Sequence, residues 1–292
     1  MKKRKETMYG LMYIAPSFLL ILVFSIIPIF MNVYFSLTDY NIIQPPVWVG
    51  FENFRKMFSD TFFHASLKNT LLFTLLTVPV QSILSLFLAS VLADFFRDRF
   101  GSFAKSTLFI PVIASAVLTG LIWPVLLNTR GPINLILSVF GFEPVNWLGG
   151  QTSSMISVCI TTIWKNVGYF MVIYYAGIMD IPRTYYEAAE VDGANALQRF
   201  FKITLPGLSN INFLVIIMGT IWSCQVFDIV YTMTNGGPGT STTTLVLTIY
   251  KAAFKEYRMG YASALSLILF ILVLIISILQ RKILNRQEDF YD

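Results

Sequence analysis

The chain has 292 residues, of which 55% are hydrophobic and only 13% are charged, with a formal net charge of +5. Soluble domains carry about 25% charged residues, so too few polar side chains remain here to cover a water-facing globule. The mean hydropathy of +0.67 predicts an integral membrane protein. The positive charge does not indicate nucleic-acid binding, because basic residues in a membrane protein mark the loops on one side.

Six apolar stretches predict membrane-spanning helices, since a helix needs about 20 mostly apolar residues to cross the hydrocarbon layer. They are residues 11–37, 70–93, 106–127, 154–179, 208–233 and 260–280. Long runs without alternating polarity exclude a β-barrel. The predicted fold is an all-α integral membrane protein with six transmembrane helices, and residues 1–292 form a single transmembrane domain.

The distribution of Lys and Arg predicts the orientation. Four basic residues, Lys2 to Lys5, precede the first stretch. They could begin a signal peptide, but 11–37 is too long for a signal core and no clear cleavage site follows, so we expect a retained span. The inner segments are then 1–10, 94–105, 180–207 and 281–292. These hold most of the 21 Lys and Arg residues, which predicts that both termini are cytoplasmic.

Three basic residues run against this pattern, since Lys251, Lys255 and Arg258 lie on the predicted outer side. In the first outer loop, Phe51, Phe54, Met57 and Phe58 have helical spacing and predict a short amphipathic helix. A packed loop without a separate role is the alternative.

The metal-binding residue types are few. Cys159 and Cys224 lie inside apolar stretches without metal-type spacing, and His64 is the one histidine. We therefore expect no metal site.

The polar segment 180–207 has the features of a helical hairpin. Pro182 can occupy the first turn of a helix, and Gly193 can form the corner after it. Ala188 and Ala189 would let a partner surface approach closely, beside the charge of Glu187. An ordinary cytoplasmic hairpin without a partner is the alternative.

The residues Glu187-Ala188-Ala189, then Gly193, then Ile203 and Leu205-Pro206 resemble the EAA loop of permease subunits of ATP-binding-cassette (ABC) importers. Two further blocks resemble the permeases of the maltose and multiple-sugar type. One is Thr234 to Pro238, followed by Thr242 to Thr244, and the other is Trp48 to Phe54. The resemblance covers nearly the whole chain.

This resemblance implies a type I ABC importer permease fold and a function in ATP-driven, binding-protein-dependent import of sugars or oligosaccharides. A polyol or a sugar phosphate is the alternative solute. The implied partners are a second homologous permease, two ATPase subunits, an extracellular solute-binding protein and membrane lipid, with no nucleic acid. The implied location is a bacterial or archaeal plasma membrane.

The resemblance also implies that this subunit is not an enzyme and binds no cofactor. ATP and Mg²⁺ would be used by the separate ATPase, and the chain lacks the G-x-x-x-x-G-K-[ST] phosphate-binding motif. The residues implied to couple to the ATPase are Glu187, Ala188, Ala189, Asp192, Gly193 and Ala194.

Polar and aromatic side chains in the fourth and fifth predicted spans are candidates for the solute pathway, because polar groups inside a membrane are costly and often functional. These candidates are Thr162, Trp164, Lys165, Asn166, Tyr169, Trp222, Ser223, Gln225 and Asp228. The resemblance implies that the sugar lies between these two spans. Aromatic faces and amide or hydroxyl groups suit a sugar, but hydrogen bonding between helices is an equal alternative.

Lys165 and Asp228 are the charges placed inside the predicted spans. An ion pair between them would have to bridge roughly 10 Å along the helix axis. If Lys165 faces the pathway, we expect its replacement by Met to reduce transport more than folding.

Two other classes of protein fit the sequence less well. A membrane enzyme would be expected to carry catalytic histidines or clustered carboxylates near an interface. A secondary transporter would be expected to contain internal repeats and coupling charges.

Overall fold

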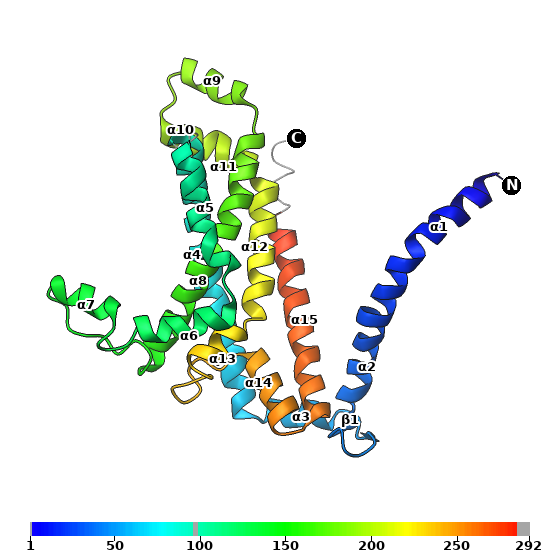
Figure 1. The fold of residues 1–292 in the computed structure, drawn as a ribbon. Coiled ribbons are helices and arrows are strands. Elements are labelled where there is room, and N and C mark those ends of the chain that lie inside the picture. Colours follow the sequence, from blue (N-terminus) through cyan, green and yellow to red (C-terminus); the bar gives the residue numbers. More distant parts are fainter. Residues whose placement is uncertain (1, 96–98, 285–292) are drawn as a thin grey trace. The chain divides into compact units, whose positions relative to one another are not determined.

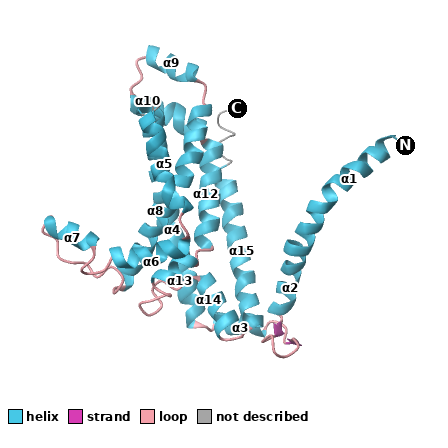
Figure 2. Cartoon of the chain, in the orientation of Figure 1, coloured by secondary structure: helices cyan, strands magenta, loops and turns pink. Residues whose placement is uncertain are grey.

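In the computed structural model, residues 2–95 and 99–284 are described, and they are almost entirely helical (Figure 2). Of the predicted inner segments, residues 96–98 and 285–292 lie outside the described residues, as does Met1. The chain forms two compact units. The first contains Met1–Thr61 and Thr248–Phe270, and the second contains Phe62–Leu247 and Ile271–Asp292.

The first unit begins with a long apolar helix. Its elements are α1 (Lys2–Ile21), the π-helical turn η1 (Leu22–Ile26), α2 (Ile27–Ser36), β1 (Thr38–Asp39), β2 (Val47–Trp48), α3 (Glu52–Phe58), the π-helical turn η3 (Lys251–Lys255) and the first part of α15 (Met259–Leu284). The strands β1 and β2 pair antiparallel. The predicted short helix in the first loop is confirmed as α3, which buries Met57 and exposes Phe58.

Close backbone contacts hold the loops of this unit. The side-chain amide of Asn53 donates to the carbonyls of Ser36 at 3.0 Å and Thr38 at 2.8 Å. A Cβ on Gly260 would lie 2.0 Å from the carbonyl oxygen of Thr38, so α15 begins in direct backbone contact with β1. The hydroxyl of Tyr261 donates to the carboxylate of Asp60 at 2.6 Å.

The second unit contains the segments that carry the site candidates. Its elements are α4 (Thr61–Phe95), α5 (Arg99–Ile113), α6 (Ala116–Leu126), α7 (Pro132–Val139), α8 (Gln151–Asp180), α9 (Arg183–Val191), α10 (Ala196–Arg199), the π-helical turn η2 (Phe200–Thr204), α11 (Leu205–Gly207), α12 (Ser209–Cys224) and α13 (Asp228–Met233). The helix α14 (Leu245–Tyr250) leads from this unit into the first.

The core of the second unit is an apolar cluster of residues from α4, α8 and α12, with Leu208 just before α12. Its members are Ala89, Leu92, Ala93, Phe170, Met171, Tyr174, Ile178, Leu208 and Val215. Within this unit, α9 and α10 lie at the opposite end of the helices from α6 and α13 (Figure 1).

Within the described residues, four helices are long and apolar enough to cross a membrane. They cover Met12–Ser36, Thr61–Asp94, Gln151–Asp180 and Met259–Ile283. Two bent pairs also qualify: Gly101–Ile113 with Ala116–Leu126, bent by 99°, and Ala196–Gly207 with Ser209–Cys224, bent by 70°. The described chain therefore has four spans, or up to six if each bent pair crosses once, and is a multi-pass membrane protein.

The structure corrects two predicted spans, because neither is one continuous helix. The stretch 106–127 breaks between α5 and α6, where Ser115 has an extended backbone (ψ 137°). The stretch 208–233 ends its first helix at Cys224, and α13 begins at Asp228 after a non-helical turn. Hydropathy does not detect the first break, because the residues around Ser115 are mostly apolar, whereas the second break is flanked by the polar side chains of Gln225 and Asp228.

The loop after α13 is tightly hydrogen-bonded. The hydroxyls of Thr234 and Thr242 lie 2.7 Å apart, and Thr243 donates to the carbonyl of Gly236 at 3.0 Å. The side-chain amide of Asn69 on α4 donates to the carbonyl of Thr240 at 2.6 Å. The glycine-proline block noted in the sequence is thus an ordered loop fixed to α4.

Candidate functional site

The polar segment between α8 and α12 forms the predicted helical hairpin. Pro182 immediately precedes α9, and the helix ends at Val191 with Asp192 as its C-cap. Gly193 has φ +77°, and a Cβ there would meet nothing within 4 Å. The amide of Ala194 donates to the carbonyl of Ala189 at 2.8 Å, which is the hydrogen bond of a Schellman C-cap. The predicted turn at Gly193 is confirmed.

One face of α9 is open to a partner. Glu187, Ala188, Asp192 and Gly193 are exposed, whereas Ala189 and Ala194 are half-buried. Tyr185 and Val191 are 61% and 88% exposed. Exposed apolar side chains beside a carboxylate and a small alanine suit a protein interface better than open solvent.

The opposite side of α9 is tied to the chain segment that returns to the membrane. The hydroxyls of Tyr186 and Thr204 lie 2.9 Å apart. One turn further along α9, Glu190 forms an ion pair with Arg199. Both partners lie in the return segment, defined here as α10 with η2 (Ala196–Thr204). The two interactions close α9 and the return segment into one unit, which the sequence analysis did not predict.

A cavity of about 420 Å³ lies behind α9. Its charged lining residues are Asp94, Arg183, Glu190 and Arg199. The apolar part of the lining comes from the end of α8, at Ile178 and Met179, and from Ile181 just beyond it. Both contacts between α9 and the return segment lie at this cavity, since its lining also includes Tyr186 and Thr204.

The second candidate region joins aromatic side chains from three helices. Trp222 on α12 lies 5.0 Å from Tyr169 and 5.4 Å from Phe170, both on α8, measured between ring centroids. Trp164 on α8 lies 5.4 Å from Trp123 on α6. The sequence analysis did not include Trp123, because nothing in the sequence links α6 to α8 at this point.

Trp164 and Trp222 are 42% and 40% exposed, so their faces are open. Partly exposed aromatic faces in a membrane protein can contact lipid, a partner helix or the apolar face of a sugar. The structure brings two of the candidate residues, Tyr169 on α8 and Trp222 on α12, into ring contact, and Asn166 is half-buried on α8.

Thr162 and Ser223 do not face open space. They are 5% and 3% exposed, and the Thr162 hydroxyl donates to the carbonyl of Val158 at 2.8 Å. This geometry fits the helix-packing alternative for these two residues.

Gln225 and Asp228 lie at the break in the fifth predicted span, and both are exposed. Gln225 follows the end of α12, and its backbone N–H donates to the carbonyl of Ile221 at 3.2 Å. Asp228 is the first residue of α13, where a carboxylate is stabilised by the helix dipole.

The ammonium of Lys165 does not pair with Asp228. It donates to the carbonyl of Ala114 at 2.6 Å, and to those of Val112 and Pro111 at 3.2 and 3.4 Å. Ion pairs found elsewhere in the described part of the chain include Lys56–Glu52, Arg199–Glu190 and Arg258–Glu256. The ion pair between Lys165 and Asp228, for which the sequence indicated an offset of roughly 10 Å along the helix axis, is not formed, because the break in the third predicted span offers the ammonium nearer acceptors.

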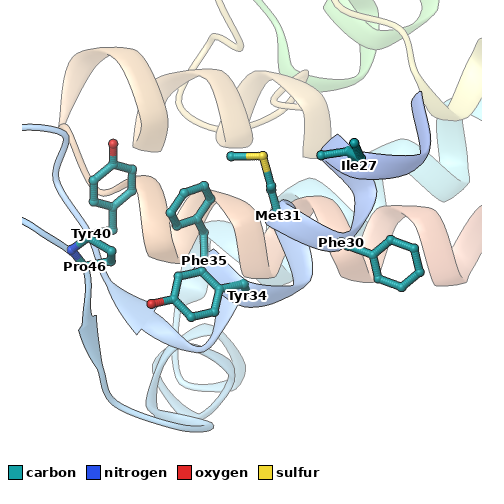
Figure 3. Close-up of a pocket in the computed structure, with 7 residues that line it drawn as sticks. All are labelled: Ile27, Phe30, Met31, Tyr34, Phe35, Tyr40 and Pro46. Carbon is teal, nitrogen blue, oxygen red and sulfur yellow. The ribbon is translucent and has the colours of Figure 1, made fainter. Parts of the chain in front are cut away.

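A second concavity, in the first unit, is unsuited to a sugar. It has a volume of about 590 Å³ and lies at the end of α2 (Figure 3). Its lining residues are Ile27, Phe30, Met31, Tyr34, Phe35, Tyr40 and Pro46. The rings of Phe35 and Tyr40 stack at 4.7 Å. A lining with two phenol hydroxyls as its polar side-chain groups suits hydrocarbon, not a ligand covered in hydroxyls.

A metal centre is not formed by the part of the chain that the structure describes, which contains no group of three or more His, Cys, Asp or Glu residues able to hold an ion. Cys159 and Cys224 are both buried and unpaired with each other.

Comparison with known proteins identifies the family. The model of the binding-protein-dependent transport system inner membrane component matches residues 132–288, more than half of the chain. The chain belongs to this family. The matched region contains α8, the α9 hairpin, α12 and α13, and therefore nearly all of the candidate residues described above.

Similar proteins extend the match over the full length. A probable ABC transporter permease protein, YurN, of Bacillus subtilis strain 168 is 34% identical over 282 residues, covering 95% of this chain and 96% of the relative. The trehalose/maltose transport system permease protein MalF of Thermococcus litoralis is 34% identical, covering 98% and 97%. The predicted resemblance to sugar-type ABC permeases is confirmed.

A solved structure shows the same fold. It is a bacterial alginate ABC transporter in complex with an alginate pentasaccharide-bound periplasmic protein. One of its chains matches with a TM-score of 0.83 and 22% identity, covering 97% of this chain and 96% of that chain. The fold of an ABC importer permease is thereby established for this sequence.

Proposed function

We propose that this protein is the membrane-spanning subunit of an ATP-driven importer of sugars or oligosaccharides. It works with a second homologous permease, two cytoplasmic ATPase subunits and an extracellular solute-binding protein, in a bacterial or archaeal plasma membrane. ATP and Mg²⁺ are bound by the ATPase, and this chain supplies part of the sugar pathway. Both termini and α9 face the cytoplasm.

The observation that carries the proposal is the arrangement of α9. An exposed surface with Glu187, Ala188, Asp192 and Gly193 lies on a helix whose other side is tied to the return segment. A helix tied in this way can transmit a push or pull from a bound ATPase to α8 and α12 as a rigid-body movement.

The proposed sugar pathway uses aromatic and amide side chains of α8 and of the end of α12. Trp164, Tyr169 and Trp222 offer faces for the apolar side of a sugar ring, and Asn166 and Gln225 offer amides for its hydroxyls. The names of several relatives support a carbohydrate, since they are permeases named for trehalose/maltose, lactose, arabinooligosaccharides and sulfoquinovosyl glycerol.

The test is ATP hydrolysis by the reconstituted complex in proteoliposomes, with binding proteins loaded with maltose, trehalose, lactose or an arabino-oligosaccharide. We expect one sugar to stimulate hydrolysis. We expect Glu187→Ala to lower that stimulation about fivefold, the effect of losing ~1 kcal/mol at an interface.

The matched control is Glu143→Ala, since Glu143 is an exposed glutamate outside the hairpin, and it should leave stimulation unchanged. If no ATPase co-purifies and no sugar stimulates hydrolysis, the proposal fails. If a polyol or a sugar phosphate stimulates ATP hydrolysis instead, the protein is still an importer subunit, but its solute is not a sugar.

A further inference from the structure

The break between α5 and α6 leaves backbone acceptors inside the membrane region. The two helices meet at 99°, and Ser115 between them is extended. The last four carbonyls of any helix have no hydrogen-bond donor within that helix. The hydrocarbon layer contains no water that could donate to them instead. The end of α5 therefore needs a donor from elsewhere.

Lys165 supplies this donor. Its ammonium, which has three N–H groups, lies 2.6 Å from the oxygen of Ala114, 3.2 Å from that of Val112 and 3.4 Å from that of Pro111. A positive charge at the carboxyl end of a helix is also stabilised by the helix dipole. The ammonium is thus fully occupied by the backbone of the break, an arrangement that we call the Lys165 cap.

The base of the Lys165 side chain is held in place by a close helix contact. Gly168, one turn further along α8, faces the carbonyl of Leu108 on α5, and a Cβ there would lie 2.1 Å from that oxygen. The α5 and α8 backbones therefore touch just before the break, and the cap extends from this fixed contact.

Beyond the break, α6 packs on a different partner. A Cβ on Gly120 would lie 1.7 Å from the hydroxyl oxygen of Thr232 on α13, so α6 and α13 are in close contact. The helix α13 also follows a break, at residues 225–227. Trp123 of α6 meets Trp164, the neighbour of Lys165. The angle of α6 thus determines where Trp123 and α13 lie.

We propose that Lys165 is a positioning residue for transport, which caps α5 so that α6 and α13 turn together about residues 114–115. This inference rests on the proposed function. Removing the charge leaves the carbonyls of the break without their donor and lets α6 adopt several angles. The step that should suffer is the conformational change, and sugar affinity should persist because the N–H groups of the ammonium are already used by the carbonyls of the break.

The kinetic test uses the reconstituted complex and the best-transported sugar of the panel above. Lys165→Met should lower the maximal uptake rate about tenfold while the half-saturating concentration of loaded binding protein changes less than about twofold. Lys165→Arg, which keeps charge and donors, should recover most of the rate. Lys105→Met is the matched control, since the Lys105 ammonium also connects α5 with α8: it extends from α5 over the ring of Tyr175 on α8. It should stay within about twofold of the unsubstituted protein.

A structural readout tests the cap without any transport. In the chain held in lipid nanodiscs, Lys165→Met should raise hydrogen exchange of the amides of residues 119–123 about tenfold, because these amides are bonded within α6 from Thr119 onward, and Lys105→Met should not. If Lys165→Met does not accumulate, Lys165→Gln replaces it with the same expectation. If the unsubstituted complex does not import sugar, the proposed function is wrong. The hydrogen-exchange measurement then still tests whether the Lys165 cap holds α6.

Two results would overturn the inference. A raised half-saturating concentration at an unchanged maximal rate would place the role of Lys165 in binding and not in the conformational change. Unchanged exchange at 119–123 would mean that the cap does not hold α6.

Discussion

Gly168→Ala is expected to lower the unfolding temperature of the protein by several degrees. A methyl group at this position would lie 2.1 Å from the carbonyl oxygen of Leu108 and 3.2 Å from the Cα of Phe109, and both atoms belong to the α5 backbone. Backbone atoms cannot relieve a clash by changing rotamer, as a side chain can. The helices α5 and α8 must therefore separate by ~1 Å to make room for the methyl group. Such overpacking costs about 1–3 kcal/mol, which exceeds the roughly 1 kcal/mol gained by replacing a helical glycine.

Gly177→Ala is the matched control on the same helix. A methyl group there would meet Ile211 at 1.9 Å and Leu208 at 2.9 Å, but the atoms met are the far ends of side chains. A changed rotamer costs of order 0.5–1.5 kcal/mol, which the gain in helix propensity largely offsets. The unfolding temperature should therefore change little.

Both variants can be followed with a thiol-reactive fluorescent dye, because Cys159 and Cys224 are buried and become reactive when the helices open. Equal unfolding temperatures for Gly168→Ala and Gly177→Ala would show that α5 and α8 can move apart at little cost in stability. That result would also remove the fixed base from the Lys165 cap.

The sequence predicted the helices well where hydropathy decides them. The stretches 70–93 and 154–179 lie within α4 and α8, because burial in lipid requires long apolar runs and backbone bonds closed within the helix. The corner at Gly193 was also predictable, since a left-handed residue after a helix favours glycine.

The breaks were not predictable, and the prolines explain why. Pro79 and Pro124 lie inside the helices α4 and α6, whereas the chain breaks just after Pro111. A proline removes one donor wherever it occurs. Whether the helix then breaks depends on neighbours that accept the new backbone direction, here Lys165 and Gly168, more than 50 residues away.

The candidate site residues also fall into two groups, those that the sequence predicts and those that it does not. Residues with a local signature, such as Glu187 and Gly193, were named from the sequence. Trp123 and Arg199 were missed because their roles depend on partners in other segments, Trp164 and Glu190. The spacing of Tyr186 and Glu190, four residues apart on one side of α9, was a usable signal, because such residues share a helix face.

Reversing the charge of Arg199 is expected to uncouple ATP hydrolysis from sugar uptake in the proposed importer. Arg199→Glu replaces the ion pair with two carboxylates that repel each other, while the hydroxyl contact of Tyr186 with Thr204 remains. The side chains of Arg199 and Glu190 are 27% and 61% exposed, so the pair stabilises the fold by less than about 1 kcal/mol. The unfolding temperature should therefore barely change.

The coupling ratio, sugar molecules imported per ATP hydrolysed, should nevertheless fall about fivefold, because α9 can then move without the return segment. Tyr186→Phe combined with Arg199→Glu removes both contacts and should lower the ratio further. Exchanging the charges, Glu190→Arg with Arg199→Glu, restores an ion pair of opposite direction and should restore the ratio to within about twofold.

This charge exchange distinguishes a pair that couples α9 to the return segment from residues that contact the ATPase directly. If Glu190 or Arg199 instead contacted the ATPase directly, the exchanged pair would present the wrong charge to it and the ratio would stay low. Recovery by the exchange, with an unfolding temperature unchanged throughout, is the outcome expected if the two arms of the hairpin transmit force as one body. An unchanged ratio in the single reversal would mean that α9 moves the membrane helices through its backbone connection to α8 alone.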